Sequence, residues 1–455
     1  MARRLRDLAA PAYLLGCLIL GGSAQGIWAN MVLQLAGLGL IAWAALVPAE
    51  PQTRPAGKQL LAVAVLGLAV IAVQLIPLPP SIWQHLGPRH LIADGYRLLG
   101  IALPWQPLSV APYDSLGSLL SLIPPLAMLI AVLRLGCRPP LLAVALLIGT
   151  FAGILLGALQ VSSPDPEVSP WYLYPETNFG LATGFFANAN HMADLLVVTL
   201  PFLAALLASA RGTEAGVQRY SALVALVAGA TLVIAVGIAL NGSLAGYGLA
   251  VPVLLASATI ALPRRDAIGR WLAPVAAILF IGAVGWLATT PLSSSASLRS
   301  NAQHSVQSRS EILTTSVKAA KAFMPFGSGI GTFPRVYALF EDQDHLDPNT
   351  SVNHAHNDYV EIALESGVAG LVVLALFLAW WAHSAWRAWR AAEPFARAAA
   401  VASGAILIHS LVDFPLRTAA IGGCFAMSLG LLLWRRPAPA PDKSHLWPTR
   451  HVVID

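Results

Sequence analysis

Charged residues are scarce in this chain of 455 residues, because Asp, Glu, Lys and Arg together make up only 11% of it. An ordinary globular domain contains about 25%. Hydrophobic residues make up 57%, and apolar runs long enough to cross a hydrocarbon core of about 30 Å as helices recur from one end to the other. The composition therefore excludes a set of soluble domains and predicts one helical membrane domain.

Cysteine is also nearly absent. The three cysteines are Cys17, Cys137 and Cys424. None of them lies in a long polar segment, so neither a disulfide framework nor a zinc site is indicated. The formal charge of +5 does not predict a nucleic-acid partner, because the Lys and Arg residues lie in short loops between apolar runs.

The apolar runs predict an all-α, polytopic membrane protein with about twelve transmembrane helices and one long, partly helical periplasmic loop. The expected spans lie near residues 9–25, 29–48, 59–79, 114–134, 140–160, 190–209, 221–240, 244–263, 271–290, 367–385, 397–413 and 418–434. The expected divisions are 1–290 (nine spans, with periplasmic loops 80–113 and 161–189), 291–366 (the long loop), 367–434 (three spans) and 435–455 (a tail).

Lys and Arg indicate the orientation, because they favour the cytoplasmic side of a membrane. Placing both termini in the cytoplasm puts most short basic loops inside, so we expect a bacterial inner-membrane protein with cytoplasmic N- and C-termini. The basic start, Met1–Asp7, precedes an apolar run. This pattern also fits a cleaved signal peptide, but we favour a first span.

The long loop has its own local pattern. Ser308–Glu311 reads as a capping box that opens a helix, and Met324–Pro325 should end it. The glycine-rich segment 326–333 predicts a tight turn rather than a nucleotide loop, because no Lys-Ser or Lys-Thr follows. A second helix should begin near Asn357, which places His356 at a helix N-terminus close to the membrane. His354 and His356 are too few for a metal site.

Polar side chains inside predicted spans are costly and suggest function. His191 and Asp194 are three residues apart, and His409 and Asp413 are four apart, so each pair can meet on one helix face. Substrate contact and hydrogen bonding between spans both remain open for them. The remaining loop histidines are expected to be exposed, namely His304, His345 and His354.

His356, Asn357, Gly367 and Gly370 match every fixed position of a known signature. The pattern is His, then Asn, Ser or Gln, then nine residues, Gly, two residues, and Gly, Thr or Tyr. It resembles the O-antigen ligase and polymerase family. Other family motifs are similar to segments spread over residues 100–434, namely Gly184–His191, Ser308–Arg309 with Pro325–Gly329, and His409–Phe414.

The resemblance implies transfer of a glycan from a polyprenyl pyrophosphate to an acceptor hydroxyl at the periplasmic face, without a nucleotide, metal or other cofactor. The partners would be the lipid-linked donor, lipid A-core or another glycan as acceptor, and membrane lipids. His356 would be the general base. Arg309 is the first candidate for the pyrophosphate, with Arg335 and Arg417 as substitutes. The further substrate-binding candidates are Asn357, Asn190, His191, Asp194, His409 and Asp413.

One departure from the family is clear. Many members have Ser-Arg-Gly where this chain has Ser243-Leu244-Ala245-Gly246, and Ala189 stands where many relatives have Arg. Ligase and polymerase activity both remain possible. A transporter or flippase needs no long loop with a matched His, whereas a catalytically degenerate relative would explain the missing Arg.

Overall fold

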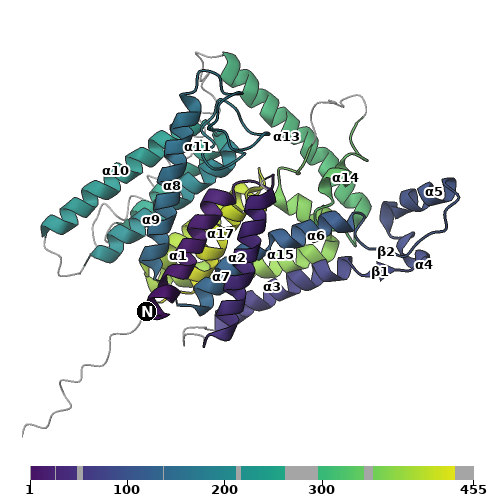
Figure 1. The fold of residues 1–455 in the computed structure, drawn as a ribbon, viewed down its shortest axis with the longest axis horizontal. Helices are drawn as coiled ribbons and strands as arrows, with labels where there is room; N and C mark the ends of the chain where they lie inside the picture. Colours follow the sequence, from purple (N-terminus) through teal and green to yellow (C-terminus); the bar gives the residue numbers. More distant parts are fainter. Residues whose placement is uncertain are drawn as a thin grey trace, which may run out of the picture.

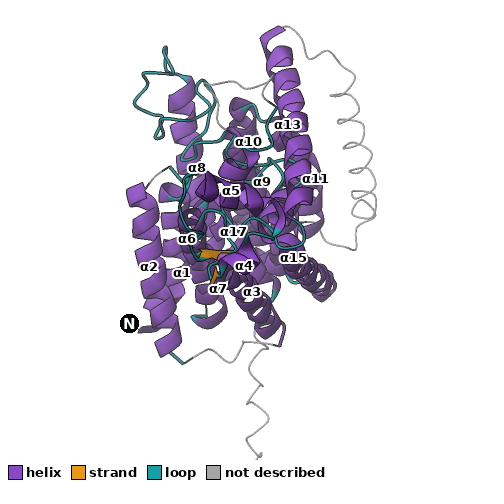
Figure 2. Cartoon of the chain, turned by 90° about the vertical axis from the view of Figure 1, so that its right-hand side faces the viewer, coloured by secondary structure: helices purple, strands orange, loops and turns teal. Residues whose placement is uncertain are grey.

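The computed structural model describes residues 2–25, 27–48, 55–136, 138–211, 217–261, 296–342 and 352–435. Within these ranges the chain is a bundle of helices with one two-stranded sheet (Figures 1 and 2). The expected span 271–290, the loop residue His345 and the tail beyond residue 435 lie outside the described residues. His304 lies in a described helix, but its side chain is outside them.

The first third of the chain holds three long helices and a small folded element. The long helices are α1 (Ala2–Leu20), α2 (Ile27–Leu46) and α3 (Pro55–Gln74). The expected loop 80–113 is partly structured, with α4 (Pro80–Trp83), η1 (Gly87–Arg89) and α5 (His90–Leu98) between strands β1 (Pro77–Leu78) and β2 (Gln106–Pro107). The strands pair antiparallel, Pro77 opposite Pro107. The fold is therefore nearly, but not strictly, all-α.

The span expected at 114–134 is present as Pro112–Arg134, which is long and apolar enough to cross a membrane, but proline interrupts its helix. The structure has α6 (Pro112–Ser121) and α7 (Ile123–Arg134) instead of one helix. The break falls just before Pro124 and Pro125, which lack the amide hydrogen that a continuous helix requires. The next four helices lie close to the expected spans, and they are α8 (Pro139–Val161), α9 (Ala189–Ala210), α10 (Val217–Asn241) and α11 (Leu244–Ala261).

Helix α13 (Ala296–Phe323) corrects the prediction of a capping box. Ser308 lies in the interior of this helix, so it is not the N-cap of a helix. The expected end is right, because the helix stops at Phe323, just before Pro325. Helix α14 (Phe333–Tyr337) follows. Its Phe333 and Tyr337 pack with Ile312 and Phe323 in a small apolar core separate from that of the bundle.

Helix α15 (Asp358–Ala391) is broken at Gly367, whose φ of 56° and ψ of −147° are not helical. The break frees the carbonyl groups of Leu364 and Glu365, because Val368 N donates to Pro325 O instead. The glycine-rich segment takes their place, since Ser328 N donates to Leu364 O and Gly329 N to Glu365 O, each at 2.9 Å. The segment is thus a tight turn docked on α15.

Close backbone approach explains a glycine in that turn. Gly327 has a φ of +78°, and a Cβ atom there would lie 2.5 Å from Glu365 O. Any side chain would therefore push the turn away from α15. The turn sets where the chain leaves α13 relative to the start of α15.

The last elements are α16 (Pro394–His409), η3 (Pro415–Arg417) and α17 (Ala419–Leu432). Helix α16 ends at His409 rather than near residue 413 as expected, so residues 410–418 form an irregular connection. Helix α9 is the most central, with 83% of its most apolar window buried. It packs against α8, α10, α11 and α16.

Eight helical stretches of the described residues are long and apolar enough to cross a membrane, with the consecutive helices α6 and α7 (Pro112–Arg134) taken as one, and α16 and α17 are shorter apolar helices. This finding supports a multi-pass membrane protein. The total of about twelve spans and the periplasmic placement of the long loop stay predictions.

Candidate functional site

Four helix ends meet at one end of the bundle. The starts of α9, α15 and α17 lie there with the end of α16, and backbone hydrogen bonds tie the connections together. Asp358 N donates to Ser410 O at 2.9 Å, and Ala420 N donates to Gly21 O at 3.0 Å. The candidate residues from distant parts of the sequence therefore converge on the 410–418 connection.

Asp413 is the centre of this site, and its residue is 0% exposed. Its Oδ1 atom lies 3.3 Å from His356 Nδ1 and accepts a hydrogen bond of 2.9 Å from Phe414 N. Its Oδ2 atom accepts from Asn190 Nδ2 and lies 3.7 Å from Arg309 Nη2. Three segments distant in sequence thus contact one carboxylate.

These contacts decide the charge of Asp413. Burial by itself would raise its pKa, but the hydrogen bond from His356 and the nearby His191 and His409 outweigh it and hold the pKa well below its usual range. Asp413 is therefore ionised under all physiological conditions, and it can stabilise positive charge on His356.

The backbone presents His356 to this carboxylate. His356 has a φ of +49°, unusual for a residue with a side chain. The next residue, Asn357, is the N-cap of α15, and its Oδ1 accepts from Tyr359 N and Val360 N, each at 3.0 Å. The His356 side chain is 23% exposed. With Nδ1 directed at Asp413, Nε2 is the ring nitrogen left for a substrate.

Phe414 lies among three histidine rings. Its centroid is 4.3 Å from that of His354, 4.9 Å from that of His356 and 5.2 Å from that of His191. His354 Nδ1 also lies 2.9 Å from Glu361 Oε1. The prediction that His354 is merely an exposed loop residue is therefore wrong, since its side chain is only 24% exposed.

A buried pair continues the site into the bundle. His409 Nδ1 lies 2.7 Å from Asp194 Oδ2, and His409 Nε2 lies 4.0 Å from Asp413 Oδ2. Asp194 thus pairs with His409, not with His191 as their spacing suggested. His409 and Asp413 do approach each other, although Asp413 lies beyond the end of α16. His191 Nε2, Asp194 Oδ2 and both ring nitrogens of His409 are buried without a hydrogen-bond partner among the described residues, so the contact between Asp194 and His409 is an ion pair by distance and not a hydrogen bond.

A second charged cluster surrounds Arg417. Its Nη2 lies 3.1 Å from Glu361 Oε1 and 3.5 Å from Glu365 Oε2, and its Nε lies 3.4 Å from Asp358 Oδ1. The three carboxylates raise the pKa of Arg417, although burial acts in the opposite direction. The cluster fixes the 410–418 connection to the first turns of α15.

The structure separates the three candidate arginines. Arg309 lies beside Asp413, and its side chain is 31% exposed. Arg417 is bound to the carboxylates of α15. Arg335 pairs with Asp114 of α6 and has a side chain that is 68% exposed. Only Arg309 contacts the cluster of Asp413 and His356 directly.

The position of the missing family arginine is close to the site. Ser243 Oγ donates to Asn190 Oδ1 at 2.7 Å, and Asn190 donates in turn to Asp413. Leu244, which stands at the Arg position, is 53% exposed. Among the candidate arginines, Arg309 is the one that contacts Asp413, the carboxylate to which Asn190 donates.

The α15 carboxylates and Phe414 were not singled out from the sequence. Asp358, Glu361 and Glu365 occupy positions i, i+3 and i+7, which lie on one helix face. All three are buried, at 4%, 1% and 1% exposure. Three acidic residues on one helix face that leads into an apolar run could have predicted a nearby cation, because buried carboxylates require a partner of opposite charge.

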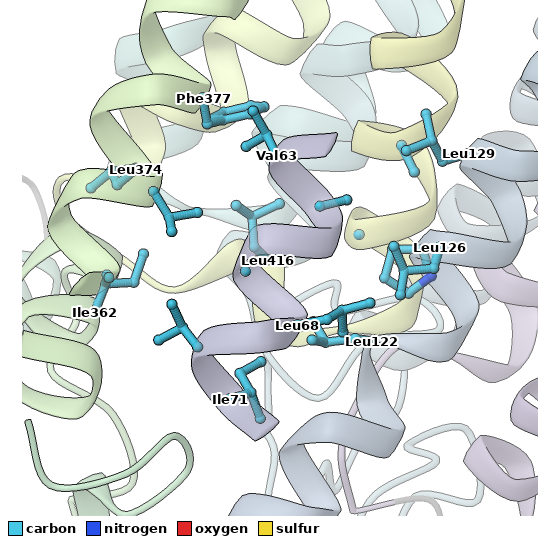
Figure 3. A pocket seen from close by; sticks show the side chains of 18 of the residues that line it. Val63, Leu68, Ile71, Leu122, Leu126, Leu129, Ile362, Leu374, Phe377 and Leu416 are labelled. Atoms are coloured by element: carbon cyan, nitrogen blue, oxygen red, sulfur yellow. The ribbon is translucent and has the colours of Figure 1, made fainter. Parts of the chain in front are cut away.

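An apolar cavity of about 400 Å³ lies beside the second cluster. Helices α3, α7, α15 and α17 line it with side chains such as Val63, Leu126, Leu374 and Phe377 (Figure 3). Ser366 and Leu416, which also line it, are the chain neighbours of Glu365 and Arg417. The cavity thus adjoins residues next to the second cluster in the chain.

Within the part of the chain that the structure describes, no group of three or more His, Cys, Asp and Glu side chains is arranged to hold a metal ion. The fold and site define a multi-pass helical membrane protein with a His–carboxylate pair and an arginine at one end. Residues 229–375 match the family model described as O-antigen ligase, which supports the O-antigen ligase and polymerase family. No curated protein matches the chain. The match supports the family that the motifs predicted, and with it glycan transfer at a bacterial membrane in the general sense.

Removing the cation of the second cluster tests its structural role. We expect Arg417→Gln to lower the free energy of unfolding by about 3 kcal/mol, because it leaves three buried carboxylates without their cation. Arg335→Gln, which breaks an exposed ion pair, is the matched control and should change little. Thermal unfolding of the detergent-solubilised protein measures both. Equal unfolding midpoints for the two variants would contradict the role of Arg417.

Proposed function

We propose that this protein transfers a glycan from a polyprenyl pyrophosphate to an acceptor hydroxyl at the periplasmic face of the inner membrane, as an O-antigen ligase does. Both termini then lie in the cytoplasm. The observation that carries the proposal is the 3.3 Å approach of His356 Nδ1 to the buried carboxylate of Asp413. His356 and Arg309 both lie in the segment that matches the family model.

In the proposed reaction His356 is the general base. Its Nε2 removes the proton of the acceptor hydroxyl as the hydroxyl oxygen bonds to the anomeric carbon of the donor. The bond between that carbon and the pyrophosphate oxygen breaks, and the electron pair leaves with the pyrophosphate. Asp413 orients the ring through Nδ1 and stabilises the imidazolium that forms.

Arg309 is the proposed ligand of the departing pyrophosphate. A guanidinium binds phosphate oxygens through two parallel hydrogen bonds and keeps its charge at any physiological pH. Arg309 is better placed than Arg417, which already has three carboxylate partners. It is also partly exposed, so an anion can reach it.

The apolar cavity is the proposed place for a lipid chain of a substrate. Its walls are side chains of spanning helices (Figure 3), and Ser366 and Leu416, the chain neighbours of Glu365 and Arg417, are among the residues that line it. A lipid chain seated there would bring its attached polar group to the end of the bundle where His356 lies.

Asn357, Asn190, His191, Asp194, His409 and Asp413 remain proposed members of the substrate site. Asn357 caps α15, and Asn190 donates a hydrogen bond to Asp413. Both therefore support the reactive pair, which is His356 with Asp413. The same chemistry also serves a polymerase that extends one lipid-linked glycan with another. Deleting the gene separates them: loss of all long glycan from the lipid acceptor indicates a ligase, and retention of single repeat units indicates a polymerase.

His356→Ala is the first test. We expect glycan transfer to fall by about a hundred- to ten-thousand-fold, because the general base is lost. The assay is size analysis of the lipid-attached glycan made by membranes of a host that lacks the gene and carries each variant. His383→Ala, at the opposite end of α15, is the control and should retain activity. Full transfer by normally inserted His356→Ala protein would refute the assignment.

A second test concerns Arg309. Arg309→Gln should reduce transfer by about fifty- to a hundred-fold and weaken the apparent affinity for the donor, because a charge-assisted contact to phosphate is lost. Arg309→Lys should recover part of the loss. The control is Lys318→Gln, which removes an exposed cation from the same helix. If Arg309→Gln and Lys318→Gln behave alike, the pyrophosphate site lies elsewhere.

A third test fills the cavity. Val373→Trp should lower transfer by about tenfold or more, because the indole ring occupies space that the lipid chain needs. Leu376→Trp, on an exposed face of the same helix, is the matched control. Transfer rates at saturating and limiting donor show whether binding is affected. Unchanged transfer by Val373→Trp would show that the cavity does not hold the lipid chain of a substrate.

A further inference from the structure

Asp194 and His409 form the inner pair of the proposed substrate site and lie beneath its surface. Both residues are nearly inaccessible, at 2% and 1% exposure. Yet they are joined to the reactive pair in one series of atoms. His356 Nδ1 is 3.3 Å from Asp413 Oδ1, Asp413 Oδ2 is 4.0 Å from His409 Nε2, and His409 Nδ1 is 2.7 Å from Asp194 Oδ2.

The series contains two buried carboxylates, and a buried carboxylate requires a cation nearby. Arg309 lies beside Asp413 at 3.7 Å. His409 lies within ion-pair distance of two carboxylates, through Nδ1 at 2.7 Å from Asp194 Oδ2 and through Nε2 at 4.0 Å from Asp413 Oδ2. These are electrostatic contacts, since neither ring nitrogen has a hydrogen-bond partner among the described residues, and an imidazolium between two carboxylates is stabilised by both charges.

We propose that Asp194 and His409 are positioning residues that hold a buried imidazolium against Asp413, so that His356 stays neutral and able to accept a proton. The inference rests on the proposed role of His356 as base. With Arg309 and His409 as cations, the charges of Asp194 and Asp413 are compensated without His356. A neutral His356 then has its Nε2 lone pair available.

Other groups face this series from each packed element. Helix α9 contributes His191, α13 contributes Arg309, α17 contributes the buried thiol of Cys424, and the segment before α15 contributes His354 and His356. His191 has no hydrogen-bond partner for Nε2 among the described residues. It therefore competes poorly with His409 for the proton, because an imidazolium there would have no carboxylate in direct contact.

The proposal predicts the direction of a pH shift. Asp194→Asn removes the charge that keeps His409 protonated, so the negative charge of Asp413 acts more strongly on His356. The acid limb of the transfer rate should then move upward by about 0.5 to 1 pH unit. If His409 were neutral, removing the Asp194 charge would instead move the limb downward.

The experiment measures initial transfer rates between about pH 5 and pH 9 in membranes of a host that lacks the gene, with its endogenous lipid-linked glycan as donor. Asp194→Asn, His409→Gln and the double variant should all move the limb upward, and His409→Gln should move it furthest, because it removes the imidazolium and keeps the negative charge of Asp194. Thr199→Val is the control, as Thr199 is buried on the same helix and bonds to Thr150. An unchanged or downward-shifted limb overturns the proposal.

Nitrogen-15 NMR of histidine-labelled wild-type protein provides a reading that needs no variant to fold. One imidazolium should persist at a pH above the range in which ordinary histidines lose their proton, and it should disappear in His409→Gln. Absence of any imidazolium at that pH overturns the proposal. The His356→Ala result is independent: loss of activity there with no pH shift in Asp194→Asn leaves the proposed function intact and rejects only this inference.

Discussion

The site depends on one carboxylate that the fold has taken completely out of water. Asp413 is 0% exposed, and its two oxygens contact groups from α9, α13 and the segment before α15. An ionised carboxylate without such partners would be very costly in this environment. The positions of Asn190, Arg309 and His356 are therefore linked, because each helps to stabilise the same charge.

Two charged clusters, one around Asp413 and one around Arg417, fix the position of the 410–418 connection. On one side Asp413 gathers nitrogen donors around a single carboxylate. On the other, Arg417 gathers three carboxylates around a single guanidinium. The two arginines therefore differ in their capacity to bind a further anion. Arg417 already contacts three carboxylates, whereas Arg309 contacts Asp413 and has a side chain that is 31% exposed.

Much of the fold could be predicted from the sequence, because apolar run length directly reflects the thickness of a membrane. The helix starts at Asn188 and Asn357 follow from capping side chains, which act locally. The prediction that a helix begins at Ser308 was wrong, because the same capping pattern also occurs on the surface within a helix. The pairing of Asp194 with His409 could not be predicted, since it depends on how α9 and α16 pack.

The motifs located the site better than they explained it. His356, Asn190 and Asp413 come from three separate motifs, and the structure brings them into contact. Their roles as base, support and substrate ligand stay predictions. His354 shows the limit of local reasoning, because its contacts with Glu361 and Phe414 arise only from the tertiary fold.

The break at Gly367 divides α15 into two mechanical parts. The part before it is fastened to the glycine-rich turn by bonds to Leu364 and Glu365 carbonyls, and the part after it is an apolar span. A span adjusts its tilt to the thickness of the bilayer. Because α15 is not helical at Gly367, a change in the tilt of the span reaches the first turns of α15 through Gly367 and the bond from Val368 to Pro325, not along a continuous helix.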